Sequence, residues 1–424
     1  MRQRLAVLIL AAAVLSGCAS FRRNLVDLVV DAKEKPLERC DISGFEYKGL
    51  ADEVGRRPIL KVLMVHGVGT HYPGYSERLQ ENLARQMKLG VRSRLPKNIS
   101  LLDPRDGKTY LGNLRVTYWQ NKNASKNMLF YELTWSPITT PEKQIIAFDT
   151  TEQYTKFRVP FNNEMKIFLD ETLPDPMLYL VGRRSLILES SKQSVCWMLK
   201  TEWDTIPDNR EMSCFLSSRE EIRGLAEQNL SFVTHSLGSE IVKDALLGIS
   251  ERVSRAAAKD NIARLQNKEL TIYMLANQLP ILALGRPLPK VHNQIAEYCT
   301  PGASKYGKRI FKAVNIVAFS DPNDLLSYAI PQGFADKYID SRICPRVTNV
   351  SVNVAPEISA FGIGVVNPVA AHTDYDTSPK VINLITHGTY DFDSDRLLEE
   401  KCRFTELKKD RAMAAEPQTF RSRR

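Results

Sequence analysis

A serine stands in the motif Thr234-His235-Ser236-Leu237-Gly238, between a short apolar run and an amphipathic segment. A serine hydroxyl is a weak nucleophile at its ordinary pKa, so it needs exposure, a neighbouring base and donors for the developing oxyanion. A sharp turn from a strand into a helix would lift Ser236 above a sheet and leave the next backbone N–H free at the helix N-terminus. The motif therefore predicts a nucleophile at Ser236 and an oxyanion donor at Leu237.

The motif resembles the G-x-S-x-G nucleophile elbow of the α/β-hydrolase superfamily. Thr234 stands where the family has its first glycine, a position that needs a small residue because strand and helix pack closely there. The sequence HGVG, which begins at His66 directly after the apolar run 59–65, is a second match. In the superfamily this turn supplies the other oxyanion N–H while the histidine holds the loop. The resemblance assigns the second donor to Val68.

The acid and the base of such enzymes follow the serine in the chain order Ser, Asp, His. Two aspartates follow the apolar run 311–319. Asp321 precedes a proline and could simply open a turn. Asp324 is followed by two leucines and later by Pro331, which resembles the pattern in many lipases. We favour Asp324 as the acid and keep Asp321 as the alternative.

Two histidines after the last strand-like run could supply the base. His372 falls in an expected loop. His387 falls at the end of an expected helix that begins at Ser378-Pro379, because serine is a good N-cap and proline suits the first helical position. A histidine in the last helical turn complements the helix dipole, which is a structural role. His372 is therefore the predicted base.

Short apolar runs alternate with segments of helical periodicity along the chain, and the motifs lie at the ends of these runs. Continuous apolar runs are typical of strands buried on both faces of a parallel sheet, and sites in such folds lie at the carboxyl ends of the strands. The expected fold class is α/β: a mostly parallel α/β-hydrolase sheet with helices on both faces and a helical cap-like insertion over 136–229, in which no strand is expected. The strand-like runs are 59–65, 114–119, 128–135, 230–233, 270–276, 311–319 and 347–354.

The N-terminus has the pattern of an export signal. Two arginines precede an apolar run over 5–15, which is too short to span the ~30 Å hydrocarbon core of a bilayer. The sequence LSGC that ends at Cys18 resembles the lipobox of bacterial lipoproteins. The resemblance implies lipidation of Cys18. Because alanine follows this cysteine where the retention signal has aspartate, it also implies sorting to the outer membrane, on its periplasmic face.

Cysteine content and charge limit the possible partners. With Cys18 assigned to lipid, six of the seven cysteines remain in an oxidising compartment, and we expect disulfides, first Cys196–Cys214 and Cys299–Cys344. No Cys/His spacing typical of zinc appears, so neither a metal nor a cofactor is expected. The net charge is +9. The signal arginines and the tail from Lys408 account for most of it, so no nucleic-acid partner is expected.

We expect a signal peptide over 1–17, a lipidated tether and lead-in over 18–57, an α/β-hydrolase domain over 58–400 and a basic tail over 401–424. The resemblance implies a membrane-anchored, esterase- or lipase-like serine hydrolase acting on a small ester, thioester or lipid. Two alternatives stay open: an acyltransferase with the same triad, which would exclude water and admit an alcohol, and a non-catalytic binding lipoprotein. The sequence indicates no protein partner.

Overall fold

The computed structural model describes residues 33–35, 39–56, 59–93, 95–256, 262–360, 363–390 and 402–406. The expected signal peptide, the proposed lipidation site Cys18 and the tail beyond residue 406 lie outside these ranges. Within them, no helix has both the length and the apolar character needed to cross a bilayer.

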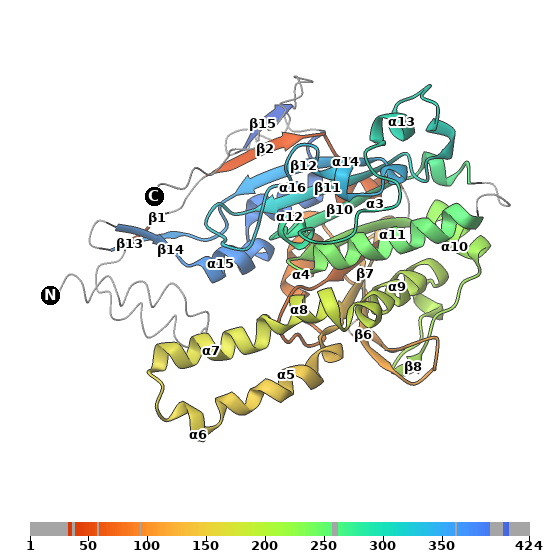
Figure 1. The fold of residues 1–424 in the computed structure, drawn as a ribbon. Coiled ribbons are helices and arrows are strands. Elements are labelled where there is room, and N and C mark those ends of the chain that lie inside the picture. The colour runs from red at the N-terminus through yellow and green to blue at the C-terminus, as the bar shows by residue number, and fades with distance from the viewer. Residues whose placement is uncertain are drawn as a thin grey trace.

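A large sheet forms the centre of the molecule (Figure 1). Its six middle strands all run parallel, in the order β7–β3–β9–β10–β11–β12. Their apolar composition follows from burial on both faces. This arrangement confirms the α/β class and the mostly parallel sheet, and each predicted run lies within a few residues of a strand. The bounds are β3 Ile59–Val65, β7 Asn127–Thr134, β9 Asn229–His235, β10 Glu269–Leu275, β11 Ala313–Ser320 and β12 Pro345–Val352.

Both edges of the sheet are mixed, which the sequence did not predict. Beside β7, the long strand β6 runs antiparallel, and it pairs in turn with β5 and β4. The short strand β8 extends this edge where no strand was expected. A separate sheet of three short antiparallel strands holds β1, β13 and β14. The bounds are β4 Gly90–Val91, β5 Lys97–Leu102, β6 Tyr110–Gln120, β8 Arg210–Met212, β1 Lys33–Lys35, β13 Glu357–Ala360 and β14 Ile363–Val366.

The opposite edge draws in both ends of the described chain. Strand β2 (Cys40–Gly44) pairs antiparallel with β12, and β15 (Arg403–Glu406) lies parallel beside β2. A disulfide joins Cys40 to Cys402. Residues placed in the lead-in 18–57 and in the tail 401–424 therefore contribute strands to the sheet. The expected boundaries fall inside the folded body because pairing and a disulfide hold these segments.

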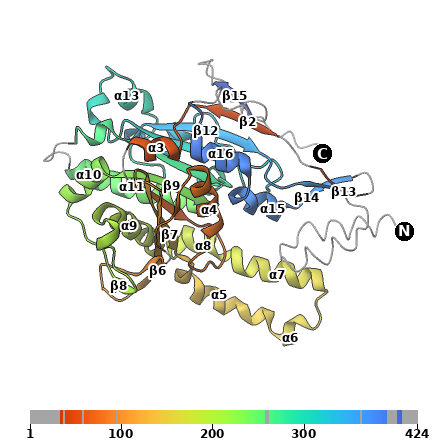
Figure 2. The same ribbon diagram turned by 180° about the vertical axis from the view of Figure 1, so that it is seen from behind.

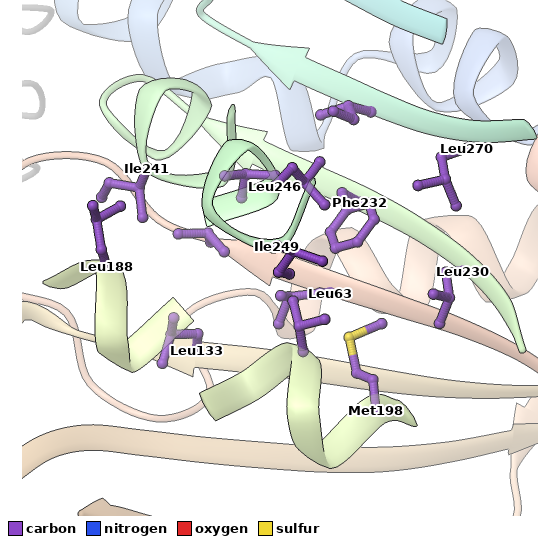
Figure 3. Packing of buried hydrophobic residues seen from close by; sticks show 14 of the residues in the cluster. Leu63, Leu133, Leu188, Met198, Leu230, Phe232, Ile241, Leu246, Ile249 and Leu270 are labelled. Carbon is purple, nitrogen blue, oxygen red and sulfur yellow. The ribbon is translucent and has the colours of Figure 1, made fainter. Parts of the chain in front are cut away.

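Helices cover both faces of the sheet. On one face, α9 (Arg184–Lys200) and α11 (Gly238–Ala256) bury Met198, Ile241 and Ile249 against Leu63 and Phe232 of β3 and β9 (Figure 3). The other face is covered by α3, α4 and α16, seen from behind in Figure 2. The bounds of the remaining longer helices are α3 Leu50–Arg56, α4 Glu77–Gln86, α10 Ser218–Glu227 and α16 Pro379–His387, and the short helices after β10 are α12 Leu279–Leu282, α13 Ile295–Cys299, α14 Phe334–Tyr338 and α15 Pro368–Thr373.

The expected insertion 136–229 divides into two parts. Helices α9 and α10 belong to the layer that covers the sheet. Residues 140–181, which we call the cap arm, project beyond the sheet instead (Figure 1). Among the arm residues whose burial is described, only Lys143, Asp175 and Tyr179 are buried. The helices of the arm are α5 Thr140–Ile146, α6 Glu152–Thr155, α7 Pro160–Thr172 and α8 Pro174–Val181.

Three disulfides pair all six cysteines other than Cys18. Besides Cys40–Cys402, they are Cys196–Cys214 and Cys299–Cys344. The two pairs with the shortest separations, chosen from the sequence, are confirmed. The third pair joins cysteines 362 positions apart.

Candidate active site

Ser236 occupies the tight turn between β9 and α11. Its φ is +54°, a left-handed conformation that is costly for a residue with a side chain and is common at functional sites. Gly238 makes the turn possible, because a Cβ there would lie 2.3 Å from the carbonyl oxygen of Val65. The Ser236 N–H donates to the carbonyl of Leu275 at 2.9 Å and ties the turn to the end of β10. The motif thus forms a strained strand-to-helix elbow with serine at its tip.

The Ser236 side chain is fully buried, whereas the sequence led us to expect an exposed hydroxyl. The turn after β3 covers it, since a Cβ added to Gly67 would lie 2.6 Å from the Ser236 Cβ and 3.1 Å from its Oγ. Glycine at this position therefore allows two backbones to meet. A ligand can reach the hydroxyl only after a local movement.

Thr234, the departure from the family pattern, fits without an unsatisfied hydroxyl. Its side chain is fully buried, and Oγ1 lies 3.4 Å from the Ser239 hydroxyl and 3.5 Å from the Tyr273 carbonyl oxygen. A buried hydroxyl with partners avoids most of the desolvation penalty of an unpaired one.

Two backbone N–H groups, one next to Ser236 and one in the turn that covers it, lack an acceptor among the described residues. These are the N–H of Leu237, which precedes α11, and the N–H of Val68, in the turn after β3. Neither donates a hydrogen bond within the part of the chain that the structure describes. Free N–H groups next to a hydroxyl, one of them at a helix N-terminus, are the donors that a developing oxyanion requires.

Asp324 and His372 form a hydrogen-bonded pair. The His372 Nδ1 lies 2.8 Å and 2.9 Å from the two carboxylate oxygens, and the carboxyl group also accepts the N–H of Leu326 at 2.9 Å. Burial acts to raise the pKa of Asp324, but its hydrogen bond with His372 and the charge of that ring outweigh burial, so the pKa lies below the ordinary value. An ionised Asp324 fixes the tautomer with a proton on Nδ1 and leaves Nε2 able to accept one.

Asp321 is occupied elsewhere. Its carboxylate accepts the backbone N–H groups of Asn323 at 2.8 Å and Val354 at 2.7 Å, and the side-chain amides of Asn323 and Asn353. These bonds close the turn after β11 and attach it to the segment after β12. The structure brings His372 to Asp324 and not to Asp321.

The expected loop around His372 is a short helix, α15. The Asn367 side chain accepts the N–H groups of Val369 and Ala370, and Pro368 occupies the first helical turn. Asparagine is a strong N-cap and proline suits the position after it, so the signal was present in the sequence. His235 steadies this helix, because its Nε2 donates to the His372 carbonyl at 2.7 Å. Burial lowers the pKa of His235 to about 3, which keeps it neutral.

Ser236 and His372 do not form a hydrogen bond with each other. Ser236 Oγ and His372 Nε2 are both buried, and neither has a hydrogen-bond partner among the described residues. The two segments are in contact, since the ring of His235, which precedes Ser236, bonds to the His372 carbonyl at 2.7 Å and lies 5.0 Å from the His372 ring. Catalytic hydrogen bonds are often long before a ligand binds. A free hydroxyl oxygen and a free imidazole nitrogen in adjacent segments leave hydrogen-bonding capacity for a ligand at this point.

The other histidines are placed differently. The Nδ1 of His66 donates to the Gly67 carbonyl at 2.8 Å, and its Nε2 accepts the Trp135 N–H at 3.1 Å. Its ring stacks between His71 and Trp135. Burial lowers the pKa of His66 well below the ordinary value. His387, the rival base, is exposed at the end of α16. In the described residues, no group of three His, Cys, Asp or Glu side chains could hold a metal ion.

Comparison of the chain with protein-family models, with curated proteins and with solved structures finds no match.

Proposed function

We propose that this protein is a serine hydrolase of the α/β-hydrolase type that cleaves carboxylic esters or thioesters, with Ser236 as nucleophile, His372 as base and Asp324 as acid. The observation that carries the proposal is the bond between Asp324 and His372, together with an unpaired, buried Ser236 Oγ on a strained turn. Ser236 Oγ and His372 Nε2 are two of several buried polar atoms without a partner among the described residues, and their position in adjacent segments calls for an explanation. A bound substrate would supply the missing hydrogen-bond partners of these two atoms.

The order of the strands supports the finer fold assignment. The HGVG turn follows β3, the serine follows the neighbouring β9 and the acid follows β11, whereas His372 lies on α15, after β14 of the separate small sheet. The first three segments leave the carboxyl ends of parallel strands, which is where sites form in open α/β sheets. The chain order Ser, Asp, His agrees with the superfamily pattern.

The chemistry would proceed through an acyl-enzyme. Ser236 Oγ attacks the carbonyl carbon while its proton passes to His372 Nε2, and Asp324 stabilises the imidazolium that forms. The N–H groups of Leu237 and Val68 would receive the oxyanion. The imidazolium then gives its proton to the departing alkoxide or thiolate. Water, activated by the same histidine, hydrolyses the acyl-serine.

Exposed apolar side chains near the candidate acid and along the cap arm favour an apolar substrate. Leu325 and Leu326, directly after Asp324, are 68% and 44% exposed, and Phe157 and Val181 of the arm are 84% and 92% exposed. Neighbouring exposed apolar side chains, such as Leu325 and Leu326, often mark a place where a ligand, a membrane or a partner binds. A lipid ester at a membrane surface fits this character and the proposed lipid anchor at Cys18 on the periplasmic face of the outer membrane.

Acyl transfer to an alcohol is the second candidate, and the complete burial of Ser236 favours it, because a transferase must exclude water. Product analysis with and without an acceptor alcohol distinguishes the two reactions. A third function, binding without catalysis, is distinguished by labelling. A fluorophosphonate probe should label the purified wild-type protein at Ser236. Absence of labelling under conditions that label a control esterase would contradict both catalytic functions.

A further inference from the structure

The buried face of α8 joins the cap arm to the segments that carry the two candidate oxyanion donors. Asp175 and Tyr179, one helical turn apart, are both fully buried. Asp175 Oδ2 accepts the N–H of Gly69 at 2.7 Å, and the Tyr179 hydroxyl donates to Asp244 of α11 at 2.6 Å. One side chain thus holds the turn after β3, and the other holds the helix that begins behind the elbow.

Three hydrogen bonds, one of them part of an ion pair with Lys143, hold the carboxylate of Asp175 next to Gly69. Besides Gly69, it accepts the ammonium of Lys143 at 2.7 Å and the hydroxyl of Thr139 at 2.7 Å. A buried carboxylate is costly unless it is paired and hydrogen-bonded, and here both conditions are met. Lys143 is itself nearly buried and belongs to the same arm. The ion pair lets a charged acceptor, which binds an N–H more strongly than a neutral one, stand inside the protein.

The bond to Gly69 acts on the neighbouring donor. Gly69 has a φ of +97°, and its N–H belongs to the peptide that follows Val68. Fixing this peptide restricts the rotation of the Val68 backbone and so the direction of the Val68 N–H. The turn has a further restraint at its start, where His66 is held by Trp135. Asp175 supplies the restraint at its other end.

We propose that Asp175 is a positioning residue for the oxyanion hole, held in place by its ion pair with Lys143. This inference rests on the proposed function. Through Asp175, the cap arm would take part in catalysis without contact with the reacting atoms. A displacement of α8 would then weaken the stabilisation of the oxyanion, so the position of the arm would set the rate of reaction.

The test compares Asp175→Ala with Asp175→Asn, which keeps an acceptor for Gly69, and with Glu152→Gln, a change to an exposed residue of the arm. We expect Asp175→Ala to lower kcat and the rate of fluorophosphonate labelling by about 10²-fold, as loss of one oxyanion donor does. KM should change little. Asp175→Asn should lose less than Asp175→Ala, and Glu152→Gln should behave as wild type. Affinity for a trifluoromethyl ketone, whose adduct carries an oxyanion, should fall in parallel with kcat/KM.

Hydrogen exchange separates this inference from the proposed function. In Asp175→Ala, the amides of residues 67–70 should exchange at least tenfold faster, while those of the distant edge strand β2 stay unchanged. Unaltered exchange in the turn, or a fall in thermal stability with unaltered kcat, would overturn the positioning role. A wild-type protein that does not react with the probe but shows the exchange effect would contradict the proposed function and leave the structural role of Asp175 in place.

Discussion

His66 follows the central strand β3 and His372 lies on α15, and their ring nitrogens are used differently. Both nitrogens of His66 have partners inside the protein, and aromatic rings cover both faces of its imidazole. In His372, Nδ1 has a carboxylate partner, and Nε2 has no partner in the part of the chain that the structure describes. Both nitrogens of His66 are occupied, so its ring holds the turn after β3. The Nε2 of His372 is available to accept a proton, as the proposed base requires.

The two aspartates after β11 differ in their partners. The carboxylate of Asp321 accepts four backbone and side-chain N–H groups of neighbouring loops, whereas both oxygens of Asp324 bond to one imidazole and one of them also accepts the Leu326 N–H. The proposed assignment of acid and base therefore depends on which hydrogen-bond partners each side chain has. The residue type alone does not decide it.

The largest effect is expected of Ser236→Ala, at the site where Ser236 Oγ and His372 Nε2 lack partners among the described residues. Loss of a triad member costs on the order of 10⁶-fold in turnover in well-studied hydrolases, and we expect a loss of that order here. Ester hydrolysis and fluorophosphonate labelling should both disappear. The circular dichroism spectrum should be that of wild type, since the hydroxyl has no partner to lose. Residual labelling at another serine would mean that the nucleophile has been misassigned.

Asp324→Asn should be the next largest change. An asparagine can no longer select the Nδ1–H tautomer or stabilise the imidazolium, which costs ~10⁴-fold in turnover in the best-studied triad. KM should stay near the wild-type value. Asp321→Asn serves as the comparison, and it should mainly lower the melting temperature because its carboxylate closes a turn. Collapse of kcat in Asp321→Asn with normal kcat in Asp324→Asn would reverse the roles of the two residues.

We expect the free energy of unfolding to depend on pH because of His66, whose two ring nitrogens both have partners. The pKa of His66 is lowered by burial, so the unfolded chain takes up its proton near pH 6.5 while the folded protein does not. The contribution of His66 is therefore complete above about pH 6.5 and is lost as the pH falls, by up to about 1.4 kcal/mol per pH unit. Urea unfolding at pH 7, 6 and 5 measures it. Equal unfolding free energies at the three values would contradict a neutral, buried His66.

His387→Ala should have the smallest effect. The ring is exposed at the end of α16, where a cation near a helix C-terminus contributes typically 0.3–1 kcal/mol. We expect kcat and KM within about twofold of wild type, measured on the same ester as for the aspartate variants. A large loss of turnover would place the base in α16 and contradict the assignment of His372.

Local signals were sufficient for the centre of the molecule. The buried strands have continuous apolar runs, and the elbow needs a glycine at 238 that the sequence displays. The cap of α15 is also a local signal, since Asn367-Pro368 has the same pattern of N-cap and proline as Ser378-Pro379 at the start of α16. Signals of this kind act over a few residues, so they can be read without knowledge of the fold.

Contacts between distant segments could not be predicted. The edge strands β2 and β15 are short and partly polar. They form because β12 offers an unpaired edge to β2, and because the Cys40–Cys402 disulfide joins β2 to the segment that contains β15. Asp175 meets Gly69 across 106 positions, in a segment whose helical pattern gives no hint of its neighbour. The burial of Ser236 likewise depends on a turn that comes from another strand.

The Cys40–Cys402 disulfide makes almost the whole described protein a closed covalent ring. A single cut by a protease anywhere between these cysteines would open the ring without releasing a fragment, so the cut protein would keep its full mass until it is reduced. A pull from before Lys33 would first load the pairing of β1 with β13, and the bridge would keep β2 and β15 joined after that pairing had opened.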